Sequence, residues 1–247
     1  MKHFLSLLVM AMAMLACQKE ISFGDGNATN NPPSSVRCTG CSYLPVCDST
    51  MLTYIDSTAM GTDTTENILL ILGDTTINGR KFTKISPSSI FAQGLLYNCD
   101  GGDYRIYQPV PDLGIDIDSL AQSLGLPVGT VPIPSHIQTT ILKTSANAGA
   151  TWTDTVFQFT PVPFLSVVAK LDYKLEQKGI QRTVLGKVFT NVIHVSSKLN
   201  IVIPMVPLPV DVTIHYYFAD GVGIIETTTA NSGVVESQTR LYKYKIK

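Results

Sequence analysis

A ten-residue segment recurs within the chain. Residues 76–85 read TINGRKFTKI and residues 183–192 read TVLGKVFTNV, so a Gly, a basic residue and Phe-Thr fall at the same spacing in both. Two further pairs of segments occur in the same order: TYIDS (53–57) with TWTDT (151–155), and YNCDG (97–101) with YFADG (217–221). Hairpins reuse Asn-Gly and Asp-Gly turns, so one such match is expected by chance. Three collinear matches favour a duplication, with copies at about residues 50–105 and 150–240.

The segments around these matches have the pattern of β-strands. FTNVIHVSS (189–197) and VDVTIHYYFA (210–219) alternate with period two. Only 15% of the residues are charged, while Thr, Val and Ile are plentiful. The Pro-rich segment 203–210 is expected at a hairpin tip, and only 116–125 resembles a helix, with Asp118 as its cap. We therefore expect a mostly β fold of two related antiparallel β-meander halves, forming an open half-barrel, clam or sandwich, with one short helix in the connector.

The last strand of this pattern carries several lysines. Lys243, Lys245 and Lys247 alternate with apolar or aromatic residues in TRLYKYKIK and would share one face of a strand. Lysines along one face are typical of an exposed edge strand that avoids pairing with other chains. The sequence therefore predicts an edge strand at this end of a β domain that spans residues 37–247.

The first residues have the features of an export signal. Lys2 and His3 precede an apolar run, Phe4 to Ala16, that only Ser6 interrupts. Such a run is shorter than the roughly 20 residues that a helix needs to cross a bilayer, but it suits the core of a signal peptide. We expect residues 1–16 to be a signal peptide. A plain signal peptide followed by an incidental cysteine is the alternative to the lipoprotein interpretation below.

The end of this run, Met14-Leu15-Ala16-Cys17, resembles the lipobox of bacterial lipoproteins. That resemblance implies that Cys17 takes a diacylglycerol and becomes the new N-terminus, and that a membrane is a partner. The following Gln18 is not the Asp of the inner-membrane retention signal, and CQKE is similar to the start of many Bacteroidota lipoproteins. This resemblance implies an outer-membrane or cell-surface location, with the periplasmic face also possible. Residues 17–36, rich in Gly, Asn, Ser and Pro, are expected to form a flexible tether with a mean reach of about 25 Å.

Four further cysteines, Cys38, Cys41, Cys47 and Cys99, follow the tether. An exported protein meets an oxidising compartment, so disulfides are expected, with three possible connectivities. The CTGC spacing also suits a zinc knuckle or a redox pair. No second CxxC supports zinc, and the residues after CTGC read as loop and strand, without the helix that usually follows a redox pair. We expect no metal and no cofactor.

The sequence contains no G-x-S-x-G, H-E-x-x-H or phosphate-binding loop. His194 and His215 would be cross-strand neighbours if their segments pair around residues 203–210, but two histidines make only half a metal site. Asp56 and Asp154, equivalent under the repeat, are candidates for a glycosidase pair or, more simply, for turn caps. Trp152, the one tryptophan, is expected in the core or as a ligand platform.

Asp is followed by Ser or Thr six times, each time before Thr, Leu or Val. This arrangement resembles the acceptor motif of Bacteroidota O-glycosylation, although Asp-Ser/Thr is also favoured in turns. The resemblance implies possible acceptors at Ser49, Ser57, Thr64, Thr75, Ser119 and Thr155.

Charge and motif content guide the functional expectation. Lys and Arg total 18 against 19 for Asp and Glu, without a basic block, which argues against nucleic acid as a partner. The paired meanders ending in YYFADGVGIIE (216–226) resemble secreted bacterial proteins of unknown function with open, half-barrel sheets. We expect a lipid-anchored envelope protein that is not an enzyme and acts as a binding or structural module for an unknown ligand or envelope protein. A carrier of hydrophobic molecules is the alternative, and a glycan-active hydrolase is the third possibility.

Overall fold

A computed structural model describes residues 38–58, 60–87, 94–110, 122, 134–162, 165–202 and 211–246. The chain divides into two units, Met1–Ser34 and Ser35–Lys247, and every described residue belongs to the second. The predicted signal peptide and tether, Cys17 included, lie outside the described residues, as do the Pro-rich segment 203–210 and the expected helix 116–125 apart from Gln122. No helix among the described residues is long and apolar enough to cross a membrane.

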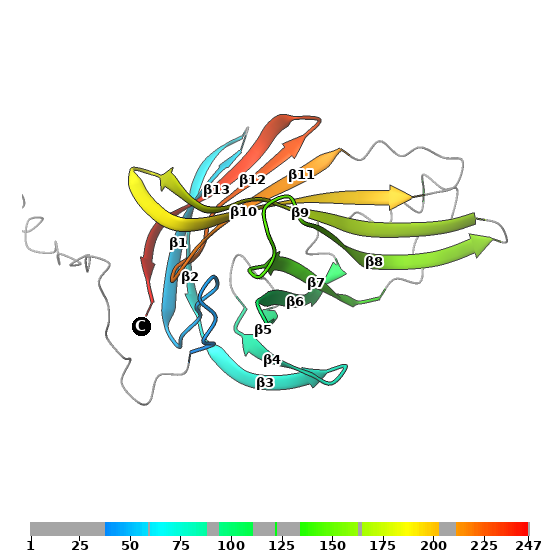
Figure 1. Ribbon diagram of the computed structural model, residues 1–247, viewed down its shortest axis with the longest axis horizontal. Helices are drawn as coiled ribbons and strands as arrows, with labels where there is room; N and C mark the ends of the chain where they lie inside the picture. Colours follow the sequence, from blue (N-terminus) through cyan, green and yellow to red (C-terminus); the bar gives the residue numbers. More distant parts are fainter. Residues whose placement is uncertain are drawn as a thin grey trace, which may run out of the picture. The chain divides into compact units, whose positions relative to one another are not determined.

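The described chain forms two antiparallel sheets (Figure 1), as the period-two pattern predicted. The larger sheet has eight strands in the order β2 (Gly61–Leu69), β1 (Thr50–Thr58), β13 (Val234–Lys245), β12 (Gly223–Asn231), β11 (Val212–Ala219), β10 (Lys187–Val202), β9 (Leu165–Val184) and β8 (Thr151–Val162). The smaller sheet has five, in the order β3 (Ile71–Ile77), β4 (Arg80–Ile85), β5 (Leu95–Asp100), β6 (Asp103–Pro109) and β7 (His136–Lys143). The mostly β fold class is confirmed.

The sheets do not coincide with the two sequence copies. β1 and β2 come from the first copy but lie in the larger sheet, and the chain passes from β2 to β3 through Leu70 alone. β13 pairs with β1 on one side and, from Val234 to Arg240, with β12 on the other, so the predicted edge strand is an inner strand of the sheet, and only its last residues, 241–245, pair with β1 alone. A local lysine pattern cannot show that the first strand of the fold, nearly two hundred residues earlier, will cover this edge.

The order of strand pairing nevertheless repeats along the chain. If β2 and β3 together are compared with the single long β9, then β1 to β7 and β8 to β13 make the same succession of hairpins. The turn glycines of the recurring segments, Gly79 and Gly186, both have positive φ, near 75° and 79°. Phe82 and Phe189, three residues later, are both buried. The turn and burial expectations are thus confirmed, while the duplication itself stays a prediction.

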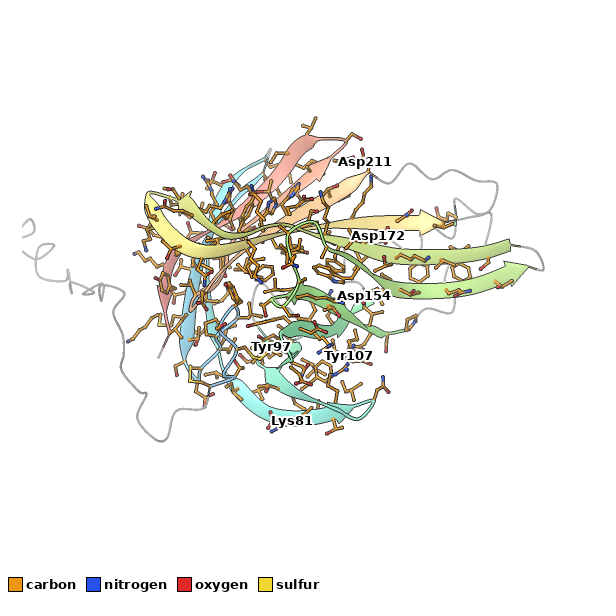
Figure 2. All side chains as sticks on the ribbon, in the orientation of Figure 1. Lys81, Tyr97, Tyr107, Asp154, Asp172 and Asp211 are labelled. Atoms are coloured by element: carbon orange, nitrogen blue, oxygen red, sulfur yellow. A yellow bond between two sulfur atoms is a disulfide. The ribbon has the colours of Figure 1, made fainter. Side chains whose placement is uncertain are left out.

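One contiguous hydrophobic cluster fills the space between the two sheets. The larger sheet contributes Leu175, Val195 and Phe218, and the smaller sheet contributes Ile85 and Tyr97, all at most 3% exposed. Figure 2 shows side chains, Tyr97 among them, in this space. Full burial of one large apolar side chain contributes about 1.5–3 kcal/mol, so this cluster is the main source of stability. A second, smaller cluster includes Val184, Phe189, Ile225 and Leu241.

Candidate functional site

Two disulfides hold the segment that leads into β1. Cys38 is bonded to Cys47, and Cys41 is bonded to Cys99 at the end of β5. The two cysteines of CTGC therefore have different partners, and the arrangement is one of the three connectivities that the sequence left open. A thiol that is part of a disulfide is neither a zinc ligand nor half of a CxxC redox pair.

A pocket of about 570 Å³ lies beside this disulfide-bonded segment. Its lining is largely polar and includes Thr39, Asn78, Arg80, Lys81, Asn98 and Asp100. Several of these groups already have protein partners: Lys81 pairs with Asp74, and the Asn98 amide donates to the Lys81 carbonyl and accepts from Arg105. A carrier of hydrophobic molecules needs an apolar cavity, and this pocket does not supply one.

A stack of polar and aromatic side chains crosses β9, β10 and β11. The guanidinium of Arg182 lies 3.5 Å from the ring centroid of Tyr217, and that ring stacks on His194 at 4.3 Å. His194 Nε2 and His215 Nδ1 are 3.0 Å apart and share a hydrogen bond. Because His194 is directly opposite Tyr217, and Ser196 opposite His215, the two histidines are diagonal neighbours across β10 and β11. The two histidines are therefore close across the strands, as expected, but each is offset by two residues from the position directly opposite the other.

A buried carboxylate anchors this stack. Glu226 on β12 is 3% exposed, and Arg182 Nε donates to its Oε2. Gln238 Nε2 on β13 donates to Oε1 at 2.5 Å. Partial burial lowers the pKa of Arg182, but the hydrogen bond from Arg182 to Glu226 and the negative charge outweigh it, so the pKa is raised overall. The side chain of Glu226 thus joins β9, β12 and β13, and Arg182 connects this group to Tyr217 of β11.

The environment of His194 favours its neutral form. Burial has the largest effect and, together with the neighbouring His215 and the charge of Arg182, lowers the pKa of His194 to about 4. Glu176 and Glu226 act in the opposite direction but do not compensate. Glu176 is itself held by Ser196 Oγ, at 2.8 Å, and by Lys174 Nζ, at 2.6 Å. Among the described residues no group of three or more His, Cys, Asp or Glu could hold a metal ion.

Acid is expected to destabilise the protein through His194. Because its pKa is near 6.5 in the unfolded chain and about 4 in the folded one, the unfolded state binds more protons between these values. The free energy of unfolding should therefore fall as the pH drops from about 6.5 towards 4, by about 1 kcal/mol after allowance for partial exposure. Urea denaturation at about pH 7 and pH 5 measures this loss.

His194→Gln should remove that part of the pH dependence. His136→Gln is the matched control, because His136 is an exposed histidine at the start of β7 that stacks on Tyr107 at 5.4 Å. If wild type and His194→Gln lose the same stability on acidification, the buried neutral histidine does not act as described.

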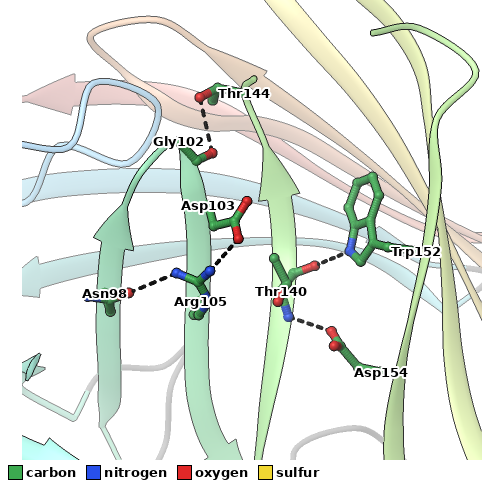
Figure 3. A network of polar contacts seen from close by, with 8 residues as sticks. All are labelled: Asn98, Gly102, Asp103, Arg105, Thr140, Thr144, Trp152 and Asp154. Carbon is green, nitrogen blue, oxygen red and sulfur yellow. Dashed lines mark hydrogen bonds and ion pairs between the residues drawn. The ribbon is translucent and has the colours of Figure 1, made fainter. Parts of the chain in front are cut away.

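A second polar network joins β7 to β8 (Figure 3). Asp154 Oδ2 accepts a hydrogen bond from the backbone N–H of Thr140 at 2.6 Å, and Trp152 Nε1 donates to the Thr140 carbonyl at 2.6 Å. The side chains of β8 thereby satisfy both backbone groups of Thr140. Trp152 also stacks on Tyr173 at 5.4 Å, and it is partly buried against the main core. Its role is therefore to hold two sheets together, as a core aromatic with a hydrogen-bonding tip.

The carboxylates that the repeat makes equivalent do not form a catalytic pair. Burial raises the pKa of Asp154, despite the hydrogen bond from Thr140. Asp56 on β1 accepts from Thr239 of β13 at 2.6 Å and from Thr65 of β2 at 3.1 Å. In the larger sheet five strands lie between β1 and β8, and each carboxylate is occupied by its own neighbours. A glycosidase needs two carboxyl groups about 5–9.5 Å apart on either side of one bond.

The six Asp-Ser/Thr acceptor candidates differ in their exposure. Thr64 and Thr155 are exposed, and Ser119 lies outside the described residues. Ser49, Ser57 and Thr75 are partly buried, and Ser57 Oγ also accepts from Arg240 at 3.1 Å. Thr64 and Thr155 are thus the two whose hydroxyls a glycosyltransferase would reach most easily, and glycosylation stays a prediction.

Sequence reasoning did not find Arg182, Tyr217 and Glu226 as a unit. A signal was present: Glu226 is the one charged residue of the otherwise apolar or hydroxylated segment 222–230, which favours a paired, buried carboxylate. Its partner could not be identified, because Arg182 lies 44 residues earlier on a strand that is not adjacent in the sheet.

Comparison with known proteins found likeness in structure only. No protein-family model matches the sequence, and no curated protein matches it. One similar solved structure is described as a "putative exported protein with YmcC-like fold" from Bacteroides fragilis, with 11% identity and a TM-score of 0.41 over 83% of this chain and 100% of that one. Another is a "putative lipoprotein" from Parabacteroides distasonis, with 13% identity and a TM-score of 0.41 over 85% of this chain and 100% of that one.

Proposed function

We propose that this chain is a lipid-anchored protein of the cell envelope, held at the outer membrane or the cell surface through Cys17. The observation that carries the proposal is the pair of disulfides, which involves all four cysteines of the folded unit. Such bonds persist in oxidising compartments outside the cytoplasm. An export signal in residues 1–16 would deliver the chain there, and a cysteine directly after that signal is where a lipid would be attached.

Within the envelope, we propose a non-catalytic binding or structural role. In the described part of the chain, the clustered ionisable groups have protein partners: Glu226 with Arg182 and Gln238, His194 with His215, and Asp154 with the backbone N–H of Thr140. A catalytic acid, base or nucleophile needs a free position beside a site where substrate can lie. The contacts of these groups instead link neighbouring strands, which suits a rigid scaffold that presents its surface to a ligand or to another envelope protein.

Cys17→Ser is expected to release the protein from membranes or to block its processing. The variant lacks the thiol to which a diacylglycerol would be attached, and the acyl chains, at about 0.8 kcal/mol per buried CH₂, would provide the attachment. The measurement is incorporation of labelled palmitate together with membrane fractionation after a carbonate wash.

Gln18→Ala is the control, since it changes the adjacent residue but keeps the thiol. It should be labelled and should stay with the membrane fraction. A wild-type protein without label, or a Cys17→Ser variant that stays wholly with the outer membrane, would show that the chain is not anchored in this way.

A further inference from the structure

Exposed tyrosine and aliphatic side chains gather with three lysines at the C-terminal end of β13, where Lys245 is exposed and Lys187 and Lys243 are partly buried. Tyr242 and Tyr244 are 41% and 39% exposed. Lys187, from the tip of the β9–β10 hairpin, donates from Nζ to the Tyr242 carbonyl at 2.9 Å and lies 5.6 Å from the centroid of the Tyr244 ring. At the same tip Val188 is 56% exposed and Leu185 is 38% exposed. We call this group the β13 patch: Leu185, Lys187, Val188, Tyr242, Lys243, Tyr244 and Lys245.

The β13 patch has a positive charge that the chain as a whole lacks. Its two segments, residues 183–190 and 241–246, contain Lys187, Lys243 and Lys245 and no acidic residue. The whole chain is close to neutral, with 18 basic and 19 acidic residues. Lys243 Nζ also lies 4.9 Å from the centroid of the Tyr242 ring, so charge and aromatic surface are interleaved.

This combination matches the chemistry of a phospholipid surface. Tyrosine is enriched at the level of lipid headgroups, where its ring meets apolar groups and its hydroxyl meets water. Lysine places its aliphatic stem along apolar surface while its ammonium group contacts anionic headgroups. Val188 and Leu185 add exposed aliphatic surface beside these side chains. Lysine is depleted in the cores of protein interfaces, so a surface with three lysines suits a protein partner less well than a membrane.

The β13 patch lies at the end of the fold where the described chain begins. Cys38 is bonded to Cys47, with their Cα atoms 3.9 Å apart, and β1 starts three residues later. Met51 of β1 is directly opposite Lys245, so Cys38 and Lys245 are separated by no more than about 25 Å. Figure 1 shows the end of β13 beside the start of β1. The chain that precedes Cys38 is therefore attached to the folded unit at this end.

We propose that the β13 patch contacts the membrane and binds an anionic phospholipid surface. The inference rests on the proposed lipid anchor, because a tether with a mean reach of about 25 Å, attached at this end, keeps the patch close to the bilayer. Anchor and patch then act together: the acyl chains hold the protein at the membrane, and the patch orients it there. The opposite end of the fold is left facing away from the bilayer.

Vesicle binding of the mature chain without its acyl group, starting at Gln18, tests the patch. The probe is vesicles of one part phosphatidylglycerol to two parts phosphatidylcholine, compared with pure phosphatidylcholine, in a sedimentation assay at low and high salt. We expect about tenfold tighter binding to the anionic vesicles, lost at high salt. Changing Lys187, Lys243 and Lys245 together to Gln should lower binding by about tenfold or more.

Two further variants test whether binding depends on the β13 patch itself or only on the total charge of the protein. Changing Lys81, Lys84 and Lys198 together to Gln removes the same charge from exposed positions elsewhere, and it should leave binding within about twofold. Leu185→Asn with Val188→Ser should weaken binding severalfold, and Asn suits the positive φ of 48° at position 185. Wild type without preference for anionic vesicles, or equal losses in the two lysine variants, would overturn the proposal. Because no acyl chain is present, these results do not depend on whether Cys17 is lipidated.

Discussion

Replacing both Cys41 and Cys99 by Ala is expected to lower the free energy of unfolding by about 4 kcal/mol. The bond joins residues 58 apart in the sequence, so without it the unfolded chain gains the freedom of a long loop. The bond also holds a loop against the smaller sheet: the backbone N–H of Tyr43 donates to the Tyr104 hydroxyl at 3.1 Å, and the two rings meet edge to face at 6.4 Å. Urea denaturation without reductant measures the loss.

The second disulfide provides the matched control. Cys38 and Cys47 are only nine residues apart, and removal of their bond should cost about 2.5 kcal/mol. The order of the two losses is thus fixed by the loop lengths. Equal losses, or a larger loss for Cys38 and Cys47, would contradict the arrangement of bonds described above. Four alkylatable thiols in the wild-type folded unit, detected by mass spectrometry without reductant, would do the same.

The local β pattern was predictable because apolar and polar residues alternate along a strand that has one buried face. The segments 189–197 and 210–219 lie within β10 and β11, apart from residues 210 and 211, for this reason. The Gly79 and Gly186 turns were also predictable, because only residues that tolerate positive φ fit there. Period and turn chemistry are local properties, and they determine which residues form strands.

Pairing between distant strands was not predictable from the same signals. Nothing near Lys243 indicates that β1 will pair with it, so the expected edge strand became an inner one. The sequence around Leu70 also gives no sign that the chain passes there from one sheet to the other, because β2 and β3 have the pattern of one continuous strand. For the histidines, a symmetric hairpin predicted that His194 and His215 face each other. The actual register shifts them by two residues, and their side chains still meet.

Arg182→Met is expected to lower the free energy of unfolding by about 3 kcal/mol. The change removes the cation beside Glu226 and the contact with the Tyr217 ring, but it keeps most of the aliphatic volume. Glu226 would then remain buried as a carboxylate with Gln238 as its nearest donor. A buried charge that loses its partner keeps the cost of desolvation without the compensating attraction, and this makes the loss large. Urea denaturation at neutral pH measures it.

A second substitution shows whether the loss of stability comes from the unpaired carboxylate of Glu226 or from lost packing around Arg182. Glu226→Gln added to Arg182→Met removes the charge and should restore much of the stability, because a neutral amide is cheaper to bury than a carboxylate. Lys198→Met is the control, since its ion pair with Asp211 is about half exposed on both sides and should be worth less than about 1 kcal/mol. If the double variant is as unstable as Arg182→Met, or if Lys198→Met costs as much, then Glu226 does not depend on Arg182 for its burial, and the link among β9, β12 and β13 is packing alone.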